Sequence, residues 1–353
     1  MTLSVFKKLR FPFWSVLWGG LLLGSCNQDP IFYSISLEVE PVDPRIAGMP
    51  THIVSVGDKV YAASKFNTTI HQYADSEWNE LPKRPGGPIL DLAATASHLY
   101  ALAGEPGSAK LYRRDTSGNW ESIANAANIQ SIYGAEEKLF AGAMTGTSSF
   151  TMLYVDDNGG ALTPLSGGSG LLQGAEYTNS TYYLAGTGIY RLENDETTLT
   201  PVKGTEGLPM VGLIALKDDN TVVGVGRKTL LTVKNSVVKA YDMGVTFTGA
   251  MALWGRLTSS EEKILLLLGI QGSSTSTTHG YREILLSSGG LGALNLRTPG
   301  ADPSSVSNYD KYNSSLGKHP VLTLFQAPDG VLFAGTTKNG LWSYRDDQWN
   351  AEP

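Results

Sequence analysis

The feature that most constrains the fold is a hairpin motif that recurs about every 40 residues along the chain. Each copy has a short apolar run, a polar turn, and a second run in which one large side chain precedes small residues. Alternation bounded by turn residues is typical of a β-hairpin. The first four copies place this large side chain 39, 40 and 43 positions apart. The residues at this position are Tyr61, Tyr100, Phe140, Tyr183, Val223, Leu266 and Phe333.

A second pair of apolar runs follows the hairpin in several copies. For example, residues 69–73 precede residues 77–81, and the second of these runs contains Trp78. Four strands that repeat every 40–50 residues indicate a propeller blade. One such sheet cannot bury both of its faces alone, so neighbouring sheets must stack around an axis. The sequence therefore predicts an all-β protein, a single β-propeller of four-stranded antiparallel blades.

The spacing predicts seven blades, although six or eight blades also fit the pattern. The predicted units begin near residues 51, 89, 129, 171, 210, 247 and 319. Two β-sandwiches are the main alternative, since they would also give many short strands. They would not require the same motif to recur at near-constant spacing over about 300 residues.

The sixth unit is long, and its outer part is the hardest to interpret. We expect its four strands at Gly249–Trp254, Lys263–Ile270, Tyr281–Leu286 and Gly292–Leu296, followed by an insertion over residues 297–318. Residues 31–40 also alternate between apolar and polar side chains. We expect them to form a further strand that pairs with the last blade and protects its open edge.

The N-terminus has the layout of a secretory signal. Lys7, Lys8 and Arg10 precede an apolar run from Phe11 to Leu23, which is shorter than the roughly 20 residues of a membrane-spanning helix. The sequence Leu-Gly-Ser-Cys at residues 23–26 resembles the lipobox of bacterial lipoproteins. This resemblance implies cleavage after residue 25 and a lipid, including palmitate-type acyl chains, on Cys26. A signal peptide with a stray cysteine and an uncleaved anchor are the alternatives.

These features divide the chain into three parts: a signal peptide at residues 1–25, a lipid-anchored segment at 26–50, and the propeller at 51–353. Cys26 is the only cysteine, so no intramolecular disulfide can form. Removal of residues 1–25 takes away three basic residues and leaves 24 basic against 33 acidic residues. No basic cluster remains, so nucleic acid is not an expected partner.

The sequence shows no catalytic, cofactor-binding or metal-binding constellation. No two of the five histidines have metal-ligand spacing, and we expect His71 and His98 on half-exposed strands or turns. Residues 115–120 match the Asp box of sialidases only in part, because the threonine is missing. The turn is better explained by an outer tryptophan that packs between blades. Residues 224–229 lack the first glycine of a phosphate-binding loop and are expected to form a turn after a strand.

The hairpins resemble those of quinoprotein-like and related bacterial propeller repeats, in which a strand of small residues follows a turn of Asp, Gly or Asn. The motif is not specific enough to imply an activity. Residues 302–318 carry Tyr309 and Tyr312, which we expect to act as a binding loop, with a solvated loop as the alternative.

We therefore expect a non-enzymatic lipoprotein in the cell envelope, anchored through its lipid to a membrane, with the outer membrane expected. Its propeller would bind a protein or a glycan, or act as a scaffold. A glycan-directed enzyme of the sialidase type and an outer-membrane protein assembly factor are the alternatives.

Overall fold

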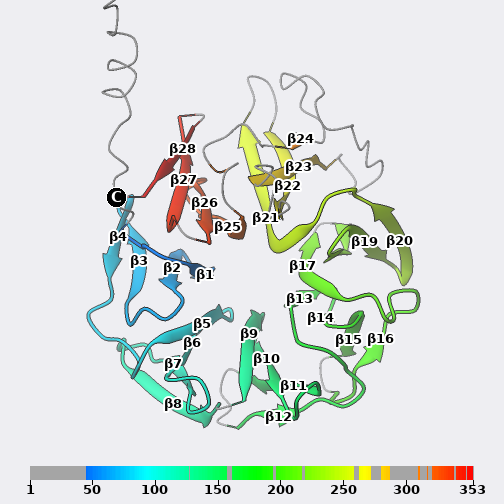
Figure 1. Cartoon of the computed structure of the whole chain (residues 1–353), viewed down its shortest axis with the longest axis horizontal. Helices are drawn as coiled ribbons and strands as arrows, with labels where there is room; N and C mark the ends of the chain where they lie inside the picture. The colour runs from blue at the N-terminus through cyan, green and yellow to red at the C-terminus, as the bar shows by residue number, and fades with distance from the viewer. Residues whose placement is uncertain are drawn as a thin grey trace, which may run out of the picture. The chain divides into compact units, whose positions relative to one another are not determined.

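The computed structural model is a ring of seven four-stranded antiparallel sheets, as Figure 1 shows. It confirms the predicted fold class and the predicted number of blades. Residues Asp43–Pro353 form one compact unit, and Met1–Val42 form a separate unit that lies outside the described residues. The structure describes residues 45–126, 128–156, 161–193, 196–216, 219–257, 262–271, 280–286, 309–310, 316, 320–337, 339–346 and 348–352.

Each blade is a meander in which consecutive strands pair from the axis outward. Blades 1 to 4 consist of β1 (Pro50–Val56), β2 (Lys59–Ser64), β3 (Ile70–Ala74), β4 (Glu77–Glu80), β5 (Ile89–Ala94), β6 (Leu99–Ala103), β7 (Lys110–Arg114), β8 (Trp120–Asn125), β9 (Ile129–Ala135), β10 (Lys138–Met144), β11 (Phe150–Asp156), β12 (Thr163–Pro164), β13 (Gly174–Thr178), β14 (Thr181–Ala185), β15 (Ile189–Glu193) and β16 (Thr200–Pro201).

Blades 5 to 7 follow the same order. They consist of β17 (Met210–Leu216), β18 (Thr221–Gly226), β19 (Thr229–Lys234), β20 (Val237–Asp242), β21 (Phe247–Leu257), β22 (Glu262–Ile270), β23 (Gly280–Leu285), β24 (Tyr309–Asp310), β25 (Val321–Gln326), β26 (Leu332–Thr336), β27 (Leu341–Arg345) and β28 (Gln348–Ala351). The turn predicted within residues 224–229 is confirmed, because β18 ends and β19 begins there.

The core lies between neighbouring blades, because each sheet has two apolar faces and no other partner for them. Tyr100, Phe140 and Phe333 are fully buried, as the repeat predicts for the second strand. Trp78 of β4 packs against Phe333 of the last blade with ring centroids 5.1 Å apart. Trp349 of β28 packs in the same way against Tyr281 of blade 6, and its indole N–H donates to the Tyr281 hydroxyl. Outer tryptophans thus pack between blades at these two positions, and Trp120, for which this packing was predicted, packs against a cluster of side chains from blades 1 and 2.

The ring closes through backbone hydrogen bonds between the start of the described chain and the last blade. The N–H of Leu341 donates to the carbonyl of Ile46, and the N–H of Arg45 donates to the carbonyl of Glu352. The Ile46 side chain is buried in a cluster with Trp78, Phe333 and other apolar side chains. A parallel bridge joins Gly48 to Asn339, as Gly280 and Pro320 are joined between blades 6 and 7. The last blade thus joins the first much as it joins its other neighbour.

Two sequence expectations about strands fall on residues outside the described part of the chain. The outer strand that the structure gives blade 6 is β24, whose residues pair with Arg282 and Glu283 of β23, and the strand expected at Gly292–Leu296 lies outside the described residues. A two-residue strand has no periodicity that a sequence pattern could reveal. The expected ring-closing strand at 31–40 lies outside the described residues. Blade 7 contains the strands β25–β28, and among the described residues the closing contacts are made by residues 45–48.

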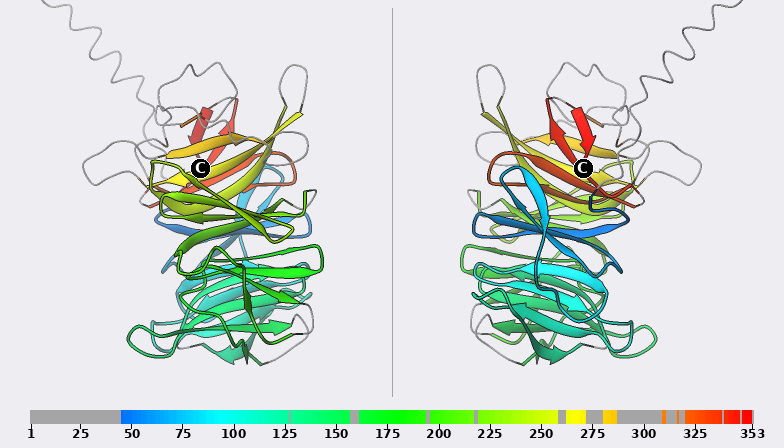
Figure 2. Two further views of the ribbon diagram at one scale, coloured as in Figure 1. Left: turned by 90° about the vertical axis from the view of Figure 1, so that its right-hand side faces the viewer. Right: turned by 90° about the vertical axis from the view of Figure 1, so that its left-hand side faces the viewer.

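The ring has two faces, which Figure 2 shows edge-on. We call the side where the first strand of each blade begins the proximal face, and the opposite side the distal face. On the proximal face, the N–H of Phe66 in the β2–β3 turn donates to Ile89 at the start of β5. On the distal face, the N–H of Ala96 in the β5–β6 turn donates to Glu136 in the β9–β10 turn. Turns on one face therefore contact each other from blade to blade.

Replacement of Trp78 tests whether this inter-blade packing stabilises the ring. Trp78 is fully buried against Tyr73 and Phe333, so Trp78→Ala would leave a cavity at the junction of the first and last blades. We expect the free energy of unfolding, measured by urea denaturation, to fall by about 3–5 kcal/mol. Trp120→Ala is the matched control, because Trp120 is only half-buried and should cost clearly less. Equal losses for the two variants would contradict this account of the core.

Candidate functional site

The first strands of all seven blades line a central cavity of about 520 Å³. A volume of this size is typical of ligand sites. In six of the seven blades, the pairing of the first strand with the second contains a β-bulge or register shift. A bulge adds a residue to one strand and changes the direction of nearby side chains. The lining is therefore set by irregular inner strands rather than by simple alternation.

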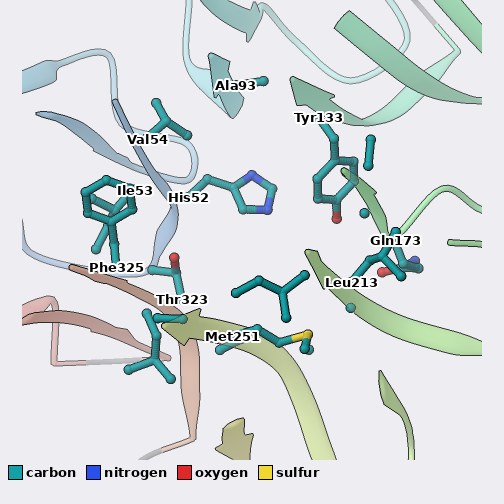
Figure 3. A pocket seen from close by; sticks show the side chains of 18 of the residues that line it. His52, Ile53, Val54, Ala93, Tyr133, Gln173, Leu213, Met251, Thr323 and Phe325 are labelled. Atoms are coloured by element: carbon teal, nitrogen blue, oxygen red, sulfur yellow. The ribbon is translucent and has the colours of Figure 1, made fainter. Parts of the chain in front are cut away.

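His52 owes its position to one of these bulges. In blade 1 the register shifts between Pro50 and Ile53, so Thr51 and His52 together face one residue of β2. The imidazole projects from β1 into the cavity toward Tyr133 of β9, as Figure 3 shows. The two rings meet edge to face with centroids 5.1 Å apart.

Asp91 holds the His52 ring and connects three blades. Its Oδ1 lies 2.6 Å from Nδ1 of His52 in blade 1. The same oxygen accepts a hydrogen bond from the N–H of Leu92, the next residue in blade 2. Its Oδ2 accepts a hydrogen bond of 3.0 Å from the N–H of Ile132 in blade 3. The carboxylate is buried, and every one of these donors compensates for the loss of water. Asp91 thus connects neighbouring blades of the propeller and also orients the imidazole of His52.

The partners of Nδ1 determine the protonation of the imidazole. Nδ1 faces the Asp91 carboxylate and, at 3.1 Å, the carbonyl oxygen of Leu92. Both partners are acceptors, so Nδ1 carries a proton and Nε2 is the nitrogen that titrates. Burial lowers the pKa of His52, but the Asp91 charge and the hydrogen bonds to Asp91 and Leu92 outweigh burial, and the pKa is raised overall.

Most of the other residues that line the cavity are apolar, but polar atoms make up slightly more of its exposed wall than apolar atoms do. Four residues of the first strands line the cavity and pair with the large side chains of the repeat on their second strands: Val54, Ile214, Leu253 and Phe325. Leu213 and Met251 line it as well. Gln173, Glu176 and Thr323 add polar groups. Burial raises the pKa of the Tyr133 hydroxyl well above its ordinary value, and the Asp91 charge adds to this effect, so Tyr133 is neutral. The cavity therefore combines apolar side chains with hydrogen-bonding groups in a wall of mixed polarity.

Other inner strands carry polar side chains that, like Asp91, reach the next blade. The Ser131 hydroxyl donates to the carbonyl of Leu172, and the Thr248 hydroxyl donates to the carbonyl of Val321. The sequence analysis missed these links and the role of His52. A single aspartate inside the apolar run of residues 89–94 was the available signal for the Asp91 link.

Of the predicted lipid-attachment and binding-loop residues, only Tyr309 lies within the described part of the chain. Cys26 and Tyr312 lie outside the described residues, and Tyr309 belongs to the outer strand β24 of blade 6. His98 is half-buried in the β5–β6 turn, as expected. His71 was expected to be half-exposed but is buried on β3, where Nδ1 has no hydrogen-bond partner. Burial, the largest effect, lowers the pKa of His71 despite the nearby Glu80 carboxylate.

Within the described ranges, no group of three or more His, Cys, Asp or Glu side chains could hold a metal ion. In the same part of the chain, no helix has the length and apolarity required to cross a membrane.

Comparison with known proteins supports the fold but gives no family. No family model matches the sequence, and no curated protein is similar to it. Among solved structures, the WD40 β-propeller domain of Doa1 matches with a TM-score of 0.57 and 12% identity, covering 86% of this chain and 95% of that domain. The designed protein Ika8 matches with a TM-score of 0.54 and 12% identity, covering 86% and 98%. YCF48 bound to D1 peptide matches with a TM-score of 0.51 and 11% identity, covering 88% of this chain and 96% of that chain.

The Asp91–His52 pair can be tested by replacing the carboxylate. Asp91→Asn keeps the shape but removes the charge and one acceptor oxygen, so we expect the pKa of His52 to fall in an NMR titration. One donor loses its acceptor, and the free energy of unfolding should fall by about 1–3 kcal/mol. Asp58→Asn, in an exposed turn, is the control and should change neither quantity.

The raised pKa also predicts how this contribution depends on pH. A raised pKa in the folded state stabilises the fold fully below the ordinary value of 6.5 and loses this effect as the pH rises through the folded-state pKa. The difference in stability between the wild type and His52→Gln should therefore shrink as the pH rises above 6.5. A difference that grows with pH would contradict the raised pKa.

Proposed function

We propose that this chain is an exported lipoprotein, anchored to a bacterial membrane through Cys26, whose propeller binds a protein partner in the cell envelope. The signal layout and the lipobox-like residues 23–26 support export and lipidation. The β-propeller supports the binding role, because a rigid ring can hold loops and inner strands in a fixed arrangement.

The central cavity is the observation that carries the binding proposal. Apolar side chains from every blade surround a space of about 520 Å³, and a few polar groups, including His52, Tyr133 and Gln173, lie among them. Ligand sites combine apolar contact area with polar groups that fix orientation, and this cavity offers both. Asp91 also connects three blades, which gives the His52–Asp91 pair a structural explanation that needs no reaction.

A peptide is a ligand of suitable form for such a ring. YCF48, which shares the fold at 11% identity, has been solved with a bound peptide. An extended segment of a partner could place an apolar side chain in the cavity and still contact the turns around its mouth.

A glycan-directed enzyme is the alternative function, and the cavity contains one feature in its favour. His52 is oriented by a carboxylate and lies beside Tyr133, an arrangement that also occurs around catalytic bases. A partner-free protein that cleaves glycans and loses this activity in His52→Gln would favour the enzyme.

Site-specific cross-linking tests the binding proposal directly. We expect benzoyl-phenylalanine in place of Phe325, which lines the cavity, to form a reproducible adduct with one envelope protein in living cells. The same label in place of Asn79, exposed on the outer strand β4, is the control and should give no such adduct. Adducts from the outer strand alone would place the partner elsewhere on the ring.

Lipidation is tested separately by mass spectrometry of the protein purified from membranes. We expect the mature chain to begin at residue 26 and to carry the mass of a diacylglycerol and an acyl chain. Cys26→Ala should remove this mass and make the protein far easier than the wild type to wash from the membrane with salt, because several acyl chains are needed for stable anchoring. An unmodified Cys26 in the purified protein would contradict the lipid anchor.

A further inference from the structure

The two faces of the ring differ sharply in charge. The distal face consists of the turns between the first and second strands and between the third and fourth strands of each blade. In the part of these turns that the structure describes, there are nine acidic residues and no lysine or arginine. They are Asp58, Asp75, Asp115, Glu136, Glu137, Glu196, Asp219, Asp329 and Asp346.

The proximal face has the opposite sign. Its described connections and chain ends contain seven basic residues, Arg45, Lys65, Lys83, Arg84, Lys203, Arg227 and Lys228, against three acidic residues, Glu105, Glu206 and the buried Glu352. Lys83 is directed to the flank, where its ammonium donates to Asn119 of a distal turn, and Lys203 lies on the flank beside Ser236. The other five basic residues are exposed on the proximal face, so it remains positive.

Phe66 adds an exposed aromatic side chain to this basic surface. It is 59% exposed in the β2–β3 turn, next to Lys65, and its backbone has a φ of 67°. A bulky residue rarely adopts this left-handed conformation. Hydrogen bonds to blade 2 on both sides hold it there, from the N–H of Phe66 to Ile89 and from the N–H of Ile89 to Asn67. Leu208, 38% exposed, is a second apolar residue on the same face.

The first described residue lies on this same side of the ring. Arg45, the first described residue, precedes β1, whose start defines the proximal face. The proposed lipid site at Cys26 is only 19 positions earlier, which limits the reach of the tether to roughly 65 Å at about 3.4 Å per residue. An anchored ring therefore stays close to the bilayer.

We propose that the proximal face docks on an anionic lipid surface, with Lys65, Arg84, Arg227 and Lys228 at the headgroups and Phe66 inserted between them. This inference rests on the proposed function, since the lipid anchor is what brings the ring to the membrane. Basic residues and exposed aromatic side chains are the usual combination of membrane-surface contacts. The acidic distal face then points away from the membrane, toward soluble partners.

Vesicle binding by the unacylated protein tests this docking. The mature chain with Cys26→Ser carries no lipid, so its binding reports only on the ring. We expect it to float with vesicles of phosphatidylcholine containing 30% phosphatidylglycerol, to bind vesicles of phosphatidylcholine alone far less, and to dissociate as the salt concentration rises. Lys65→Glu/Lys228→Glu should weaken binding by about 25-fold or more, at roughly fivefold for each basic residue lost.

Matched variants separate the face from the net charge. Lys59→Glu/Lys239→Glu changes the net charge equally, but both residues are exposed outside the proximal face, so binding should change by less than about threefold. Phe66→Gly should also weaken binding, whereas Val237→Ser, which replaces a 60%-exposed residue of β20, should not. Glycine tolerates the φ of residue 66, so the Tm of Phe66→Gly should stay unchanged or rise.

The outcomes distinguish this inference from the proposed function. Equal effects of the two charge-reversal pairs, or equal binding to both kinds of vesicle, would overturn the docking, even if Cys26 is acylated in cells. Loss of a captured envelope protein in Lys65→Glu/Lys228→Glu, without any vesicle binding by the wild type, would assign the basic face to a protein and also overturn it. Vesicle binding that depends on the proximal face supports it, even if Cys26 proves to be unmodified.

Discussion

The ring depends on one constraint: every sheet has two apolar faces, and only its two neighbours can cover them. The constraint leaves no end blade, so the first and last blades must meet. Trp78, Tyr73 and Phe333 provide the apolar part of that junction. The guanidinium of Arg345 in blade 7 donates to the Tyr73 hydroxyl, which itself donates to Asp329. Packing and polar contacts together keep the inner strands in place, and the cavity exists because they do.

Much of this fold was predictable because large side chains recur at equivalent positions of the repeat. Tyr61, Tyr100 and Phe140 marked the second strands, and Trp78 marked an outer strand, since each of these positions needs a bulky apolar group between blades. β24 was missed because its two residues carry no pattern. His71 was misjudged because a single polar residue does not show whether its strand has one or two buried faces.

The candidate site was predictable only in part, because it depends on backbone irregularity and on contacts between blades. A β-bulge directs His52 into the cavity, and the sequence of residues 50–53 contains no signal that predicts a bulge. Asp91 meets His52 and Ile132 from positions 39 and 41 residues away, so their contact follows from the ring and not from local sequence. The charges of the two faces, in contrast to the candidate site, can be predicted from the sequence once the strand order assigns each turn to a face.

Ring closure has a consequence for how the protein reaches its folded state. The closing contact between Tyr73 and Arg345 spans 272 positions, and the penultimate residue, Glu352, is buried where it pairs with Ser343 and Arg345. A chain that emerges N-terminus first can stack its blades in order, but it cannot complete the circle until β27, β28 and Glu352 have appeared. Until then the two terminal sheets keep an uncovered apolar face, and a chain that stops a few residues early keeps it permanently.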